Sequence, residues 1–161
     1  MRYDVPLIPQ PTTMSCWAAS IAMIRSWHEQ MSYDPAGIAA NHGGLSYMFQ
    51  FHHSLNPNDV YILQRNGFTV AAAQCYANTS PVVSMLQQYG PLWVATAAPA
   101  PHIRVVTGLS GQNVYINDPA PVNSGATYRR DFRAFFGQME TLAGQEMGQP
   151  APVYIAHLSR L

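Results

Sequence analysis

The hydrophobic pattern of this 161-residue chain changes its period near Gly90, and this change is what most constrains the fold. Before Gly90, apolar residues recur at helical spacing, as they do from Cys16 to Trp27 after the candidate N-cap Ser15. After Gly90, short β-branched and aromatic runs are bounded by Pro, Gly and Asn, which is typical of strands. Helices followed by strands, without regular alternation of the two, predict an α+β fold.

Cap residues and prolines predict where the other helices begin and end. Further helices are expected to start at Asp34-Pro35, Asn56-Pro57 and Ser80-Pro81, because Asp, Asn and Ser cap helices and proline suits the first turn. Gly67 and Gly90 are expected to end the last two helices, since glycine adopts the left-handed conformation of a C-cap without strain.

Four strands are predicted in the second half, at 92–96, 102–109, 114–117 and 153–157. Gly111-Gln112-Asn113 lies between the second and the third, so these two strands are expected to form a hairpin. The composition of Pro119 to Thr127 is typical of a loop.

Composition limits the classes of function. Eight acidic residues balance eight basic ones, so the charge does not indicate nucleic acid or an anionic membrane as the main partner. Apolar residues make up 48% and charged residues 10%, without a shift along the chain, which predicts one folded domain over residues 1–161. No run approaches the ~20 apolar residues of a membrane span, and the N-terminus does not resemble a signal peptide. Export would then need a dedicated secretion system or a leader that has been removed.

The two cysteines lie in different contexts. Cys16 is expected in the first turn of a helix, where backbone N–H groups and the helix dipole stabilise a thiolate. Cys75 lies in an alanine-rich stretch and is expected to be a buried, unreactive thiol.

The sequence around Cys16 resembles the nucleophile motif of the papain family. Gln10-Pro-Thr-Thr-Met-Ser-Cys-Trp-Ala-Ala-Ser20 matches this motif in both spacing and identity. The resemblance implies that Cys16 is the nucleophile and that the Gln10 side chain and the Cys16 backbone N–H form the oxyanion hole, where two fixed donors stabilise the tetrahedral intermediate. Thr13-Met14 stand where eukaryotic members have cysteine and glycine, which favours a bacterial branch.

A cysteine nucleophile works with a histidine base that an Asn or Asp orients. His102 begins a predicted strand, and its hairpin partner ends in Asn117-Asp118-Pro119. Because adjacent antiparallel strands place the start of one beside the end of the next, we expect His102 and Asp118 to be neighbours. Asn117 is the alternative orienter, since papain itself uses an asparagine. Side chains alternate along a strand, so only one of the two can face His102.

The second half of the chain is similar to bacterial papain-like peptidases. His-x-x-Val-Val-x-Gly from His102, followed by Val-Tyr-Ile-Asn-Asp-Pro, resembles AvrRpt-type effector proteases of plant pathogens and double-glycine leader peptidases of bacteriocin exporters. The resemblance implies a papain-like fold, in which an N-terminal helical part with the catalytic helix packs on a small C-terminal antiparallel sheet. It implies Cys16, His102, Asp118 and Gln10 as the catalytic residues.

No cofactor or metal is expected. His42, His52 and His53 could suggest a metal site, but adjacent histidines on a helix point apart, and no carboxylate or cysteine lies at a recognised ligand spacing from them.

These features support three hypotheses about function. The first is a bacterial effector or toxin delivered into another cell, which cleaves a protein or peptide substrate through an acyl-enzyme and whose partner could be a cognate inhibitor or immunity protein. The second is an amidase, deamidase or transglutaminase that uses the same residues on peptidoglycan or glutamine side chains. The third is a non-enzymatic binding module, against which the complete catalytic set argues.

Overall fold

The computed structural model describes residues 1–40, 60–71, 77–96, 102–137 and 154–159. Its helices are α1 (Cys16–Glu29), α2 (Pro35–Ala40), α4 (Val60–Arg65), α5 (Ser80–Tyr89) and the π-helical segment η3 (Arg133–Gly137). Its strands are β1 (Phe68–Val70), β2 (Leu92–Thr96), β3 (His102–Ser110), β4 (Asn113–Asp118), β5 (Ala126–Asp131) and β6 (Tyr154–Leu158). All strands join one antiparallel sheet in the order β1-β6-β2-β3-β4-β5, which confirms the predicted α+β class.

The described helices begin and end close to the predicted positions. α1 starts at Cys16 directly after Ser15, and α2 starts at Pro35, where the Asp34 side chain accepts a hydrogen bond from the Ala36 N–H at 3.3 Å. Gly67 and Gly90 follow α4 and α5 with φ of 85° and 87°. The predicted start at Asn56-Pro57 lies outside the described residues.

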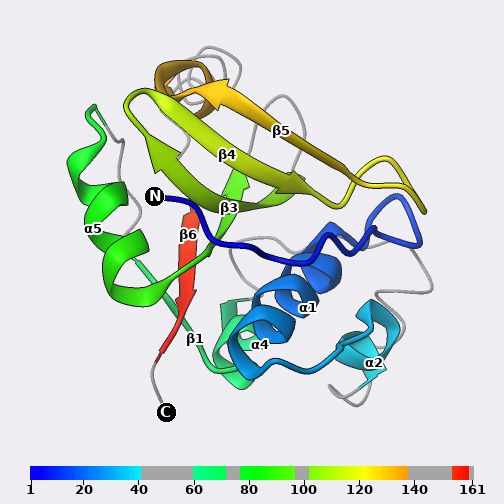
Figure 1. Cartoon of the computed structure of the whole chain (residues 1–161). Coiled ribbons are helices and arrows are strands. Elements are labelled where there is room, and N and C mark those ends of the chain that lie inside the picture. Colours follow the sequence, from blue (N-terminus) through cyan, green and yellow to red (C-terminus); the bar gives the residue numbers. More distant parts are fainter. Residues whose placement is uncertain (41–59, 72–76, 97–101, 138–153, 160–161) are drawn as a thin grey trace, which may run out of the picture.

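Both faces of the sheet are covered, and β2 shows how. Its residue Trp93 packs into a core with Trp17 and Ile21 of α1, whereas Leu92 and Val94 pack into a second core with α5 and η3. Alternate side chains of a strand face opposite sides of the sheet, so a strand covered on both sides is apolar throughout. Figure 1 shows α1 and α5 on different sides of the sheet. Among the described helices, none is long and apolar enough to cross a bilayer.

Two strands were not predicted. β1 is three residues long and lies between α4 and α5 in sequence, so the helices do not all precede the strands. β5 begins at Ala126, inside the stretch predicted to be a loop, and pairs with β4 along its whole length. Most of its side chains are exposed, so the strand lacks the apolar alternation that would have indicated it.

The N-terminal segment pairs with β3 beside the register shift between Val106 and Gly108. The Leu109 N–H donates to the Met1 carbonyl at 2.9 Å, and Arg2 forms an isolated bridge with Gly108. A Cβ atom on Gly108 would lie 2.3 Å from the Met1 carbonyl oxygen and 2.5 Å from the Arg2 Cα atom. The side chain of any other residue would therefore displace this segment.

We predict that Gly108→Ala lowers the free energy of unfolding by about 1–3 kcal/mol, because the added methyl group overpacks a backbone contact. Urea denaturation measures the effect. The matched control is Gly37→Ala in α2, where the nearest atom to a new Cβ is 4.0 Å away and where alanine favours the helix. Wild-type stability of Gly108→Ala would contradict the close approach.

Candidate active site

A histidine–carboxylate pair lies at one end of the β3–β4 hairpin. His102 is the first residue of β3, Asp118 is the last residue of β4, and the pairing of Val105 with Asn117 brings these two ends together. His102 Nε2 lies 2.8 Å from Asp118 Oδ1, within hydrogen-bond distance. The structure thus joins the two residues that the sequence predicted to be neighbours.

The alternative orienter, Asn117, is bonded elsewhere. Its Nδ2 donates to the Val5 carbonyl at 2.9 Å, and its Oδ1 accepts from the Thr127 hydroxyl at 3.2 Å. Asn117 therefore ties the N-terminal segment to β4 and β5. Because adjacent side chains of a strand point to opposite faces, Asp118 and not Asn117 contacts His102.

Three donors hold the Asp118 carboxylate. Besides His102, Oδ1 accepts from the Ala120 N–H at 2.9 Å, and Oδ2 accepts from the Tyr128 hydroxyl at 2.6 Å. Burial raises the pKa of Asp118, but the hydrogen bonds from His102 and Tyr128, the His102 charge and the Ala120 N–H together lower it below its usual value. The carboxylate is therefore ionised at neutral pH.

Cys16 lies at the first position of α1 and is buried, with 2% of its surface exposed. The hydroxyl of the preceding Ser15 does not cap the helix. It bonds instead to Thr12, accepting from the N–H at 3.0 Å and from the hydroxyl at 2.8 Å. First-turn N–H groups that the Ser15 side chain leaves uncapped can stabilise negative charge at the sulfur.

His102 connects the thiol to the carboxylate. Burial alone would lower the pKa of His102, but hydrogen bonds to Asp118 and Cys16 and the charges of both partners outweigh it and raise the pKa to about 9. Since Nε2 faces Asp118, Nδ1 is the ring nitrogen left to exchange a proton with the thiol. A protonated His102 at neutral pH suits a thiolate–imidazolium pair.

Gln10 is buried beside the loop that follows β4. Its backbone N–H donates to the Pro119 carbonyl at 2.9 Å, and its carbonyl accepts from the Asn123 N–H at 2.9 Å. Its side-chain Nε2 donates to the carbonyls of Thr12 and Thr13, at 2.8 and 3.1 Å. The orientation of the amide follows from these contacts, because a flipped amide would set its oxygen against two carbonyl oxygens. Both N–H groups are thus engaged by the loop before α1.

Of the remaining histidines and the second cysteine, those that the structure describes do not join this site. His42, His52, His53 and Cys75 lie outside the described residues. His157 on β6 stacks on Tyr89, with ring centroids 3.6 Å apart. Within the part of the chain that the structure describes, no group of three or more His, Cys, Asp or Glu side chains could hold a metal ion.

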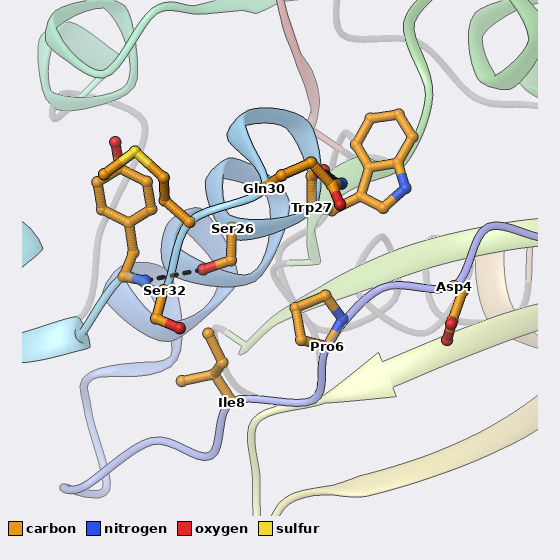
Figure 2. Close-up of a pocket in the computed structure, with 9 residues that line it drawn as sticks. Asp4, Pro6, Ile8, Ser26, Trp27, Gln30 and Ser32 are labelled. Carbon is orange, nitrogen blue, oxygen red and sulfur yellow. Dashed lines mark hydrogen bonds between the residues drawn. The ribbon is translucent and has the colours of Figure 1, made fainter.

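A separate pocket of about 410 Å³ lies near the far end of α1 (Figure 2). The helix rises 1.5 Å per residue, so Ser26 in this pocket lies about 15 Å along the axis from Cys16. The Ser26 hydroxyl accepts from the Tyr33 N–H at 3.0 Å. The pocket is lined by Asp4, Pro6, Ile8, Ser26, Trp27, Gln30, Met31, Ser32 and Tyr33.

The sequence analysis missed Tyr128 and Arg104. Tyr128 donates to Asp118, and its hydroxyl oxygen accepts from Arg104 Nη1 at 3.3 Å. Tyr128 is paired with Ile116 in the β4–β5 register, which makes Asp118 its diagonal neighbour. Recognition of β5 as a strand would have placed this hydroxyl near the carboxylate.

We predict that Asp118→Asn lowers the pKa of His102 well below about 9, because burial remains while the main charge that favours the imidazolium is lost. NMR titration of the imidazole measures this value. Asn117→Ala should leave the titration close to wild type, although it weakens the fold. A larger shift in Asn117→Ala than in Asp118→Asn would show that the orienter is misassigned.

The same shift predicts a pH dependence of stability. The folded-state pKa of His102 lies above its unfolded value, so its protonated form stabilises the fold. This contribution is complete below about pH 6.5 and is lost as the pH rises through about 9.

Comparisons with known proteins give the fold and the family. Solved structures of peptidases share the fold, and three of them are described below. A double glycine motif protease from an AMS/PCAT transporter, in complex with the leader peptide, is 20% identical with a TM-score of 0.59, over 98% of this chain and 94% of that one. The peptidase domain of Streptococcus ComA is 16% identical with a TM-score of 0.60, over 95% and 98%. A putative C39-like peptidase from Bacillus anthracis is 15% identical with a TM-score of 0.54, over 98% and 96%.

The sequence itself gives the family. No curated protein sequence matches the chain significantly. Residues 1–135, however, match the family model described as papain-like cysteine protease AvrRpt2, and this match spans the stretch that holds Gln10, Cys16, His102 and Asp118. The chain therefore belongs to the AvrRpt2 family of papain-like cysteine proteases and is a cysteine peptidase with a papain-like fold.

Proposed function

We propose that this peptidase is a bacterial effector or toxin that acts on proteins in another cell, cleaving peptide bonds through an acyl-enzyme on Cys16. The observation that carries the catalytic part is that His102 hydrogen-bonds to Asp118 at 2.8 Å, while interactions with both Asp118 and Cys16 raise its pKa to about 9. Nucleophile, base and orienter in contact are what nucleophilic catalysis requires.

The proposed reaction follows from these contacts. The Cys16 thiolate attacks the peptide carbonyl carbon, and the imidazolium of His102 then gives its proton to the leaving amine. Neutral His102 next removes a proton from water, which attacks the thioester and releases the acid and the thiolate. Asp118 holds the ring and stabilises its charged form in both steps.

The oxyanion is proposed to bind the backbone N–H of Cys16 and the amide of Gln10. In the unliganded site both Gln10 N–H groups are bonded to Thr12 and Thr13. One of them must turn toward the substrate oxygen, so this donor pair is completed when substrate binds. Catalytic hydrogen bonds often form fully only in the complex with substrate.

A peptide substrate is supported by the similarity in fold to the double glycine motif protease, which was solved with a leader peptide. The effector role is supported by membership in the AvrRpt2 family. Under this proposal the substrate is an extended segment of a protein, and a cognate inhibitor or immunity protein is an expected partner.

We predict that iodoacetamide or a peptide epoxide labels Cys16 in the native protein, because Cys16 is the first residue of α1 and its interaction with His102 helps to raise the pKa of that histidine. Mass spectrometry locates the label. Cys16→Ala should fold and lose turnover by about a thousandfold or more, while Cys75→Ser should keep both labelling and turnover. Full activity of Cys16→Ala would refute the thiol mechanism.

We also predict where the activity acts. Expression in the cytosol of a target cell should impair growth and cleave cytosolic proteins, whereas export to the bacterial periplasm should leave the cell wall intact. Cys16→Ala in each compartment is the control. Lysis on periplasmic export alone would favour a peptidoglycan amidase and contradict the effector role.

A further inference from the structure

We infer that Tyr128, held by Arg104, positions the Asp118 carboxylate so that it orients His102. This inference rests on the proposed function and extends it to a second layer of the site. It concerns Arg104 on β3 and Tyr128 on β5, which bond to each other and, through the Tyr128 hydroxyl, to Asp118.

The direction of the hydrogen bonds shows that Tyr128 donates to Asp118. Arg104 has no acceptor on its guanidinium, so in the contact at 3.3 Å the Tyr128 oxygen must accept. The phenolic proton is then free to point at Asp118 Oδ2, 2.6 Å away. Arg104 thus fixes Tyr128 as a donor, and burial together with the hydrogen bond to Asp118 raises the pKa of Tyr128 and keeps the proton on it.

The donor to Asp118 Oδ2 is a neutral hydroxyl, and its lack of charge matters for His102. Oδ1 of Asp118 accepts from His102, so its Oδ2 needs a partner that does not compete for the charge. A guanidinium in this place would form an ion pair with the carboxylate and weaken its hold on the imidazolium. A neutral hydroxyl satisfies Oδ2 and leaves the negative charge available to His102.

Packing and strand pairing hold the side chains of Arg104 and Tyr128 in place. The guanidinium of Arg104 lies over the Phe135 ring at 4.8 Å, and that of Arg130 lies over the Tyr128 ring at 4.4 Å. The β4–β5 pairing fixes the backbone of Tyr128 against Ile116. The carboxylate is thus held from Oδ2 by Tyr128 and from Oδ1 by the Ala120 N–H, which leaves His102 facing a fixed acceptor.

The direction of the pH effect of losing the Tyr128 hydroxyl follows from the groups around Asp118. The groups that bond to Asp118 are His102 from β3, Tyr128 from β5 and the Ala120 N–H, with Arg104 behind Tyr128 and Cys16 beyond His102. The Tyr128 hydroxyl stabilises the charged form of Asp118, so its loss raises the pKa of the carboxyl group. The acidic limb of any process that needs the carboxylate then moves to higher pH.

The test is Tyr128→Phe, which removes the hydroxyl and keeps the ring. We expect kcat to fall about tenfold with KM within about twofold, since a hydrogen bond to a charged group is lost away from the substrate. The acidic limb of the Cys16 alkylation rate with iodoacetamide should also move to higher pH. The matched control is Tyr115→Phe on β4, whose ring lies under the Arg2 guanidinium at 4.9 Å and which should behave as wild type.

The alkylation profile needs no substrate, so it tests this inference even if the proposed function fails. Full turnover by Cys16→Ala would refute the proposed function, whereas an unmoved acidic limb in folded Tyr128→Phe would overturn the role of Tyr128 alone. A lower rate with an unmoved limb would show that Tyr128 is only structural, and also overturns the inference. Should Tyr128→Phe not fold, Arg104→Gln replaces it, with a smaller shift in the same direction expected and no shift counting against the inference.

Discussion

The hydrogen bond between His102 and Asp118 is the contact on which the proposed chemistry depends, and the pairing of β3 with β4 creates it. Neither residue is special alone, since a histidine at the start of a strand and an Asp-Pro turn are both common. The antiparallel register brings the start of one strand beside the end of the next. Strand alternation then gives this position to Asp118, while Asn117 bonds to Val5 and Thr127. The sheet thus places a carboxylate and not an amide beside His102. Hydrogen bonds to Asp118 and Cys16 and the charges of both outweigh burial and raise the pKa of His102 to about 9.

The N-terminal segment joins the two halves of the site. It pairs with β3 at Gly108 and is held by the Asn117 amide at Val5. It then reaches Gln10, whose backbone bonds to Pro119 and Asn123. α1 follows directly, with Cys16 at its first position. Figure 1 shows this segment running from the sheet past α1 to the loop that follows β4. The position of the thiol relative to His102 is therefore set by backbone contacts with the sheet as well as by the packing of α1 in the core.

Much of the fold and of the candidate site could be predicted from local patterns. Helical periodicity, caps and glycines indicated α1, α2, α4 and α5, and β-branched runs indicated β2, β3, β4 and β6, because each element carries its own signal. β1 and β5 were not predicted, because β1 has only three residues and the exposed side chains of β5 show no alternation of apolar and polar residues. β1 pairs with β6, which is distant in the sequence, and β5 is recognisable only by its pairing with β4. The missed strand β5 also hid Tyr128, whose hydroxyl completes the shell of Asp118. The engaged state of Gln10 could not be predicted either, because it depends on the conformation of the loop at Thr12 and Thr13.

The central claim is that Cys16 attacks a peptide carbonyl with His102 as the acid and base. Acid quenching during turnover of a slowly hydrolysed peptide ester, followed by intact mass measurement and peptide mapping, tests it most directly, because a thioester survives acid while turnover stops. The account predicts an added mass equal to the acyl half of the substrate on the fragment that contains Cys16, and none in Cys16→Ala. An acyl group on any other residue, or turnover in Cys16→Ala without an acyl-enzyme, would contradict it.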